Sequence, residues 1–276
     1  MIPKKIHFCW FGNNPKTELV TFCISSWKKY LPEYEIIEWN ESNFDCTTNI
    51  FVQNAYEQKK WAFVTDYVRA FVLYKFGGIY LDSDVEIKQN LDIFLFHNAF
   101  SGFESLGFPF TAIWGSEAKH VWPEKVLNYY DNLTSFEQTT NTIIVSKLLA
   151  DEFCVDINSD KLQILDHGIA IYPSTHFCLD LPQNYASHHF NGSWTNDDIS
   201  FKNRLHDEYY LNHYCNINNR TYLLDKLYKQ KKITLDELKL FVSIKNDEIR
   251  KHKRNIQIKN LKDGIKNILN FFYLKR

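Results

Sequence analysis

Two aspartates close a short apolar strand that follows a Gly-Gly turn, and this arrangement constrains the fold of the chain more than any other feature. The segment reads FGGIYLDSDVE over residues 76–86. Side chains at positions i and i+2 of an extended strand point the same way, so Asp82 and Asp84 are expected to project together from the strand's carboxyl end. Ligands of open α/β sheets usually bind at that edge.

The paired carboxylates predict a site for a divalent metal that holds a diphosphate. Two aligned negative charges repel each other unless a cation lies between or beside them. The alternative is a surface turn, because Asp is common after strands. Taken alone, the pair favours that alternative.

Strands and helices alternate along the first half of the chain, which predicts an α/β fold with a mixed, mainly parallel sheet flanked by helices. Besides the strand that leads to Asp82, we expect strands at 5–11, 34–39, 99–103, 110–114, 162–165, 169–172 and 185–190. Helices are expected at 16–30, 61–75, 119–131 and 141–151. Beyond about residue 198 the pattern is helical throughout. We therefore expect one domain over 1–230 and a helical C-terminal extension over 231–276.

The charge of the chain is unevenly distributed. The formal net charge is -1, but residues 249–276 hold nine Lys/Arg and one Asp, a charge of +8, which leaves -9 on the rest. An acidic body with a basic end argues against nucleic-acid binding and indicates a local contact with an anionic surface. Apolar residues at helical spacing in this end fit peripheral membrane contact through 249–276, or a helix packed on the body with a solvated basic face.

Cysteine usage and the N-terminus indicate a cytoplasmic protein. The six cysteines are scattered and form no CxxC pair, so reduced thiols are expected instead of a zinc site or a disulfide framework. The first five residues run directly into a strand-like segment, and we expect no signal peptide.

Several polar and aromatic residues are expected near the aspartates. Trp10 ends the first strand at the same sheet edge, where an indole can stack on a nucleotide base; a core Trp is the alternative. Asp66 and Arg69 share one face of the helix over 61–75. They form either an internal ion pair or contacts to a ribose hydroxyl and a phosphate. Tyr80 points to the same side as Asp82 and belongs either to the core or to the pocket.

A second cluster lies later in the chain. His188 and His189 precede Ser193 and Trp194. A neutral imidazole can complete a carboxylate metal site, and an indole N–H can donate to a phosphate. Adjacent histidines are usually surface residues, and these gain interest only together with the aspartates.

Taken together and in order, these segments resemble glycosyltransferase family 32. The resemblance is strongest to bacterial capsular-polysaccharide and surface-glycan enzymes, and more distant to the glucosylating domains of large clostridial toxins. It covers roughly residues 2–195 and is carried by 2–12, 26–30, 62–69, 77–86 and 188–194.

The resemblance implies a GT-A fold and a retaining hexosyltransferase that uses a nucleotide sugar, with UDP-sugar expected, and Mn²⁺ or Mg²⁺. The acceptor would be a glycan or lipid-linked oligosaccharide in capsule or surface-polysaccharide synthesis, at the inner face of the membrane. It also assigns roles to the candidate residues. The donor would contact Trp10, Asp66, Arg69, Tyr80, Asp82, Ser193 and Trp194. The metal would be held by Asp82, Asp84 and one of His188 and His189. Catalysis would depend on Asp82, Asp84 and Arg69. Glu104 is a candidate for the acceptor side of such a transferase.

Two other classes of protein remain as alternatives. Residues 79–85 also fit the strand-DxDxV motif of haloacid-dehalogenase-type phosphohydrolases, in which Asp82 would be the nucleophile. A convincing downstream acidic motif is missing. The third hypothesis is a non-catalytic glycan-binding protein on the same fold, which the presence of all four residues Asp66, Arg69, Asp82 and Asp84 disfavours.

Overall fold

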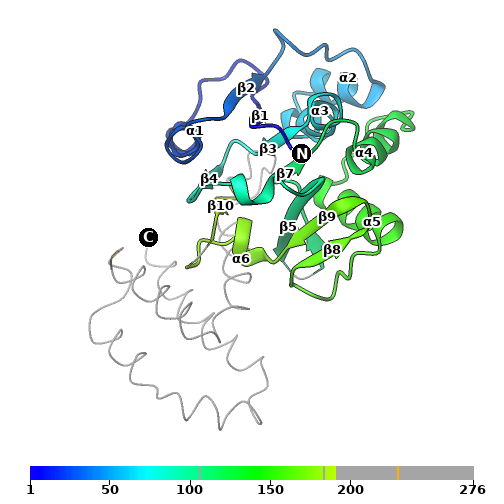
Figure 1. Cartoon of the computed structure of the whole chain (residues 1–276). Coiled ribbons are helices and arrows are strands. Elements are labelled where there is room, and N and C mark those ends of the chain that lie inside the picture. The colour runs from blue at the N-terminus through cyan, green and yellow to red at the C-terminus, as the bar shows by residue number, and fades with distance from the viewer. Residues whose placement is uncertain (106, 183, 191–228, 230–276) are drawn as a thin grey trace, which may run out of the picture. The chain divides into compact units, whose positions relative to one another are not determined.

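The computed structural model describes residues 1–105, 107–182, 184–190 and 229 (Figure 1). All of these except Lys229 belong to one compact unit, Met1–Asn196. The expected domain boundary after residue 230, the basic tail, Ser193 and Trp194 lie outside the described residues, and the expectations for them stay predictions. None of the helices in the described segments has the length and apolarity needed to cross a bilayer.

Strands and helices alternate much as the sequence predicts. The strands are β1 (Lys5–Cys9), β2 (Glu35–Trp39), β3 (Gly78–Leu81), β4 (Val85–Ile87), β5 (Ala99–Ser105), β6 (Phe108–Pro109), β7 (Ile113–Ser116), β8 (Gln163–Leu165), β9 (Ile169–Tyr172) and β10 (Ala186–His188). The α-helices are α1 (Glu18–Tyr30), α2 (Ile50–Glu57), α3 (Trp61–Phe76), α4 (Val121–Asp131), α5 (Asn141–Phe153) and α6 (Ser174–Phe177). Two short 3₁₀ turns cover Asp92–Phe94 and Asp166–Gly168. The expected strand over 110–114 begins three residues later, at Ile113.

The main sheet is mixed and mainly parallel, which confirms the expected fold class. Its order is β2-β1-β3-β7-β5-β9-β8, and β6 pairs with β5. The pairs β2–β1, β1–β3 and β5–β9 are parallel, whereas β7 and β8 are antiparallel to their neighbours. Five of the seven strands along this path therefore run in one direction. A second, two-stranded sheet joins β4 and β10 in antiparallel fashion.

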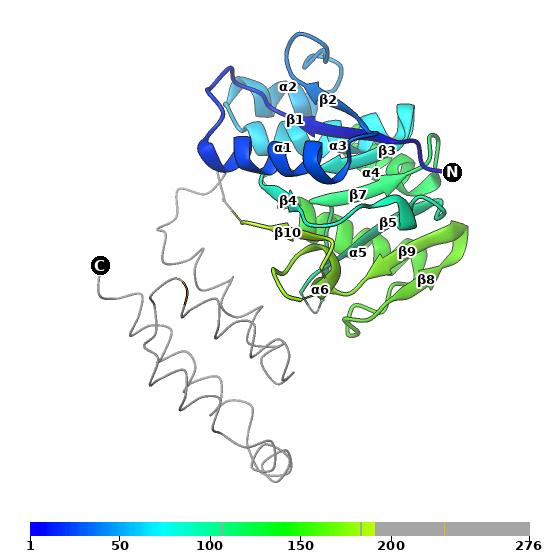
Figure 2. The same ribbon diagram turned by 60° about the vertical axis from the view of Figure 1, so that its left-hand side comes forward.

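Helices cover both faces of the main sheet (Figures 1 and 2). Helices α2, α3, α4 and α5 lie together on one face, while α1, α6 and the β4–β10 ribbon lie on the other. Helix α3 contacts β1, β3 and β7 and is itself covered by α2 and α4. Because α3 is enclosed on several sides, even its polar residues Asp66 and Arg69 are buried.

Two glycines allow α3 to end directly beside the strand that leads to the aspartates. Gly77 and Gly78 have φ values of 63° and 114°, in the region that favours glycine. A Cβ on Gly77 would lie 2.8 Å from the Ala118 nitrogen, and one on Gly78 would lie 2.8 Å from the Lys5 oxygen. The Gly-Gly pair is therefore required both by backbone conformation and by close packing.

A buried histidine fastens this junction to the first two strands. The Trp39 indole N–H donates to His7 Nδ1 at 3.0 Å, and His7 Nε2 lies 2.8 Å from the Gly77 carbonyl oxygen. Since the indole only donates, Nδ1 is the acceptor and Nε2 carries the proton, so the ring is neutral. Burial lowers the pKa of His7 to about 4.

We predict that His7 makes the stability of the domain depend on pH. The unfolded chain binds a proton at His7 below its ordinary pKa of 6.5, whereas the folded chain does not until about pH 4. Stability present above pH 6.5 is therefore lost as pH falls, by roughly 3 kcal/mol at pH 4. Urea unfolding of wild type and His7→Gln at pH 7 and pH 4 should show their difference in unfolding free energy shrinking by about that amount. A pH-independent difference would contradict the neutral buried ring.

Candidate active site

The two aspartates lie in a tight turn between β3 and β4. Strand β3 ends at Leu81, and the backbone N–H of Val85 donates to the Asp82 carbonyl at 3.0 Å. The expectation that one continuous strand carries both carboxylates is therefore wrong. The turn forms because β4 leaves the main sheet and pairs with β10.

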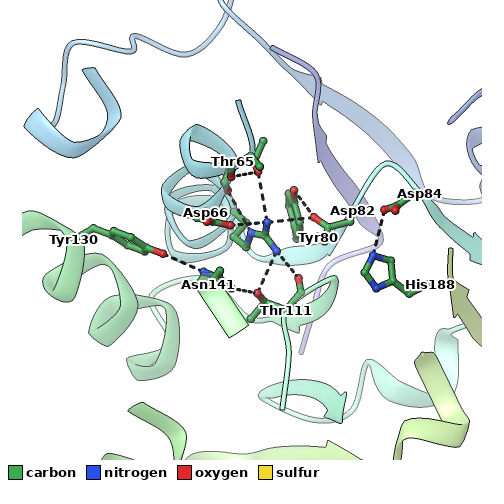
Figure 3. Close-up of polar contacts among 11 residues, drawn as sticks. Thr65, Asp66, Tyr80, Asp82, Asp84, Thr111, Tyr130, Asn141 and His188 are labelled. Carbon is green, nitrogen blue, oxygen red and sulfur yellow. Dashed lines mark hydrogen bonds and ion pairs between the residues drawn. The ribbon is translucent and has the colours of Figure 1, made fainter. Parts of the chain in front are cut away.

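The small β4–β10 sheet brings His188 to Asp84 from far along the chain. His188 pairs with Val85 across the two strands, and the His189 N–H donates to the Asp84 carbonyl at 3.1 Å. The His188 ring then places Nε2 3.3 Å from Asp84 Oδ1 (Figure 3). Backbone pairing between β4 and β10 thus fixes where the His188 imidazole lies relative to the Asp84 carboxylate.

Helix α1 holds the other side of β4 in place. The Trp27 indole N–H donates to the Val85 carbonyl at 2.7 Å. Two residues further along β4, the Ile87 N–H donates to the Ser26 hydroxyl at 2.9 Å, and that hydroxyl donates to the Cys23 carbonyl at 2.6 Å. Ser26 and Trp27 belong to a segment that carries the family resemblance, and the structure shows that they anchor the strand beside Asp84.

Asp82, Asp84 and His188 fit a divalent cation. Each offers one ligand atom, and these atoms lie within 4.8 Å of one another. Two carboxylate oxygens and one imidazole nitrogen suit a divalent cation such as Mn²⁺. His189 lies apart from this cluster, with Nε2 3.1 Å from Glu86 Oε2, so the geometry favours His188 as the third ligand.

The electrostatic potential of the cluster favours positive charge. Burial alone lowers the pKa of the His188 imidazole, but the Asp84 carboxylate more than compensates and raises it to about 9. Asp82 and Glu104 act in the same direction. The site therefore attracts a cation, as a metal centre built from carboxylates must.

Arg69 connects the helix α3 side of the site to Asp82. Its Nη2 lies 2.9 Å from Asp66 Oδ1 and 3.3 Å from Asp82 Oδ1. The Tyr80 hydroxyl donates to the same oxygen of Asp82 at 3.0 Å, and the guanidinium lies 4.8 Å from the centre of the Tyr80 ring. Burial lowers the pKa of Arg69, but the neighbouring acidic groups, Asp82 first and Asp66 among them, together outweigh that effect and raise the pKa, so the guanidinium stays charged.

The internal ion pair expected as one alternative for Asp66 and Arg69 is present. Arg69 also donates to the Thr65 carbonyl, the Thr65 hydroxyl, and both the carbonyl and the hydroxyl of Thr111. Every nitrogen of the guanidinium therefore has a protein acceptor, which suits a residue that positions Asp82. Burial raises the pKa of the Asp66 carboxyl, and Arg69 opposes that shift only in part.

The remaining candidates lie as follows. Trp10 is half-buried at the carboxyl end of β1, the strand next to β3, and its indole N–H donates to the Asn14 carbonyl at 2.7 Å. Its Nε1 is therefore engaged while the ring lies at the expected sheet edge. Glu104 lies near the end of β5 and is half-buried.

Sequence reasoning missed Thr111, Asn141 and Tyr130, which form a chain of hydrogen bonds that reaches Arg69 through Thr111 (Figure 3). All three are buried polar side chains far apart in the chain. No motif marks them. The only available signal is the pair Thr140-Asn141, which stands at the start of the apolar helical pattern over 141–151.

Comparisons with known proteins agree with this geometry. Residues 17–101 match the model of the glycosyltransferase sugar-binding region containing the DXD motif. That stretch, about a third of the chain, is thus similar to this family. The matched residues include Asp66, Arg69, Asp82 and Asp84, whereas His188 lies beyond the matched range.

Parts of the chain are similar to three proteins whose names describe glycosyltransferases. Inositol phosphoceramide mannosyltransferase 3 of Schizosaccharomyces pombe (strain 972 / ATCC 24843) is 33% identical over 105 residues, 36% of this chain and 28% of that protein. The chain thus matches less than a third of this relative. PaToxG glycosyltransferase has a TM-score of 0.44 at 15% identity, over 55% of this chain and 69% of that one. A glycosyltransferase involved in the glycosylation of the major capsid of PBCV-1 has a TM-score of 0.41 at 10% sequence identity. The match covers 74% of this chain and 99% of that one.

We predict that His188, the last residue of β10, and the adjacent His189 differ sharply in their effect on metal binding. Loss of a residue that only supports a ligand typically weakens metal affinity 10–100-fold, so His188→Ala should weaken Mn²⁺ binding by at least about 10-fold. His189→Ala is the matched control and should bind Mn²⁺ like wild type. Titration calorimetry with Mn²⁺ measures both, and the opposite ranking would contradict the geometry.

Proposed function

We propose that the protein is a metal-dependent retaining glycosyltransferase that moves a hexose or N-acetylhexosamine from a nucleotide sugar to a glycan acceptor. The observation that carries this proposal is the convergence of Asp82, Asp84 and His188 in a chain whose residues 17–101 match a DXD-type sugar-binding region. A UDP-sugar is the donor that we propose, together with capsule or surface-polysaccharide synthesis as the setting.

The chain's own residues would divide the work between metal binding and positioning. Asp82, Asp84 and His188 would hold Mn²⁺ or Mg²⁺, which when bound neutralises the charge that develops on the departing diphosphate. Arg69 and Tyr80 hold one oxygen of Asp82, so the carboxylate needs little reorganisation when the donor arrives. The Trp10 ring would stack on the base, and Ser193 and Trp194 stay proposed contacts of the diphosphate.

Among the residues that the structure describes, no arrangement at the site calls for an enzyme nucleophile. Glycosidases place two carboxyl groups on opposite sides of the scissile bond, whereas Asp82 and Asp84 point into one cluster with His188. We therefore propose front-face attack, in which the acceptor's proton passes to the leaving phosphate oxygen. Glu104 is proposed to face the acceptor.

The family match supports the transferase over the two other hypotheses, a phosphohydrolase that uses Asp82 as nucleophile and a non-catalytic glycan-binding protein. The name of the similar inositol phosphoceramide mannosyltransferase supports transfer of a hexose, and the lipid in that name fits a lipid-linked acceptor here. A cytoplasmic location at the inner face of the membrane stays a prediction.

Titration calorimetry with UDP and GDP, each with and without Mn²⁺, tests the proposal. We expect UDP to bind and to require Mn²⁺, because the metal links the diphosphate to the aspartates. Asp84→Ala should abolish Mn²⁺-dependent binding yet leave the fold intact. Asp151→Ala, which removes an exposed carboxylate on α5, is the control and should bind like wild type.

Each other result has a defined meaning. Preference for GDP would keep the transferase and change the donor to a GDP-sugar. Binding of neither nucleotide, or undiminished binding by Asp84→Ala, would contradict the proposed metal-dependent transfer.

A further inference from the structure

We propose that Thr111 and Asn141 are positioning residues, which orient Arg69 and through it the Asp82 carboxylate for metal binding. This inference rests on the metal-dependent function proposed above and extends the site into a part of the chain outside the matched sugar-binding region. Neither residue touches the metal cluster, so their effect must pass through the guanidinium.

A chain of hydrogen bonds leads from Asp82 into the interior (Figure 3). Arg69 Nη1 donates to the Thr111 hydroxyl at 3.1 Å and to the Thr111 carbonyl at 3.2 Å. The Thr111 hydroxyl donates to Asn141 Oδ1, and Asn141 Nδ2 donates to the Tyr130 hydroxyl at 3.1 Å.

The direction of each bond follows from the chemistry of the groups. A guanidinium only donates, so the Thr111 oxygen must accept from Arg69 and turn its single proton toward Asn141. That proton selects the carbonyl side of the Asn141 amide, which leaves the NH₂ group to donate to Tyr130. Thr111 is thus fixed as an acceptor for Arg69 by the residue behind it.

Burial makes this arrangement rigid. The exposed fraction is 2% for Thr111, 8% for Asn141 and 0% for Tyr130. Water does not replace a lost partner at such positions, and a buried polar group without a partner is costly. The residues come from separate elements, since Thr111 precedes β7, Tyr130 lies on α4 and Asn141 begins α5. The position of Arg69 is therefore set by the packing of α4 and α5.

The consequence appears at Asp82. Arg69 and Tyr80 both hold Oδ1 of this carboxylate, at 3.3 Å and 3.0 Å. Oδ2 accepts no hydrogen bond from any described residue, so it is the oxygen left for a cation. If Arg69 loses its anchor, the carboxylate gains rotational freedom, and the cation must restrict that freedom when it binds.

The test measures Mn²⁺ binding directly by titration calorimetry, with Mn²⁺ alone as the probe. Thr111→Val keeps the shape and the backbone carbonyl but removes the hydroxyl, and we expect Mn²⁺ affinity to fall by about 10-fold, as for other residues behind metal ligands. Thr111→Ser restores the hydroxyl and should restore the affinity. If Thr111→Val does not fold, Asn141→Ala has the same expected effect, because it removes the acceptor of the Thr111 proton.

Ser146→Ala is the matched structural control. Ser146 lies on α5, as Asn141 does, and its buried hydroxyl donates to the Pro109 carbonyl at 3.0 Å. None of the described hydrogen bonds connects this hydroxyl to Arg69. This variant should lose thermal stability as Thr111→Val does and yet bind Mn²⁺ like wild type.

Wild-type affinity in Thr111→Val, or equal weakening in Ser146→Ala, would overturn the positioning role and leave the proposed function standing. Absence of Mn²⁺ binding in wild type, with and without UDP, would overturn the proposed function and this inference together.

Discussion

The ion pair between Arg69 and Asp82 is the contact on which the rest of the site depends. A buried charge is costly unless it is paired and hydrogen-bonded, and Arg69 is 6% exposed. The structure meets that cost with Asp66 on its own helix, Asp82 across the strand end, and oxygen acceptors from Thr65 and Thr111. The guanidinium therefore ties helix α3, strand β3 and the segment before β7 together at one point beside the proposed metal.

The fold explains why two sets of elements are needed to build one cluster. The main sheet supplies Asp82, which directly follows β3. Strand β3 itself pairs in parallel with β1. The small β4–β10 sheet supplies His188 and positions Asp84, which directly precedes β4, and α1 fastens that sheet through Trp27 and Ser26. A cation shared by Asp82, Asp84 and His188 would link the two sheets, so the proposed donor binding would be physically coupled to the position of β4–β10.

Local patterns predicted the parts of the structure that depend on neighbouring residues. The apolar periodicity of 61–75 and the following Gly-Gly pair predicted α3 and its end, and strand–helix alternation predicted the fold class. The turn at Asp82–Asp84 was missed because it is imposed by pairing of β4 with β10, about a hundred residues later. The same long-range pairing separates His188 from His189. Thr111 and Asn141 carry no local pattern, since their importance comes only from what they contact.

The central claim is that Asp82, Asp84 and His188 together bind a divalent cation. Pulsed electron paramagnetic resonance of the protein with bound Mn²⁺ and UDP tests it most directly, because the technique detects nitrogen atoms coordinated to manganese. The account predicts the signal of one coordinated imidazole nitrogen, absent in His188→Ala and retained in His189→Ala. A Mn²⁺ complex without a coordinated nitrogen, or one whose nitrogen signal survives in His188→Ala, would contradict it.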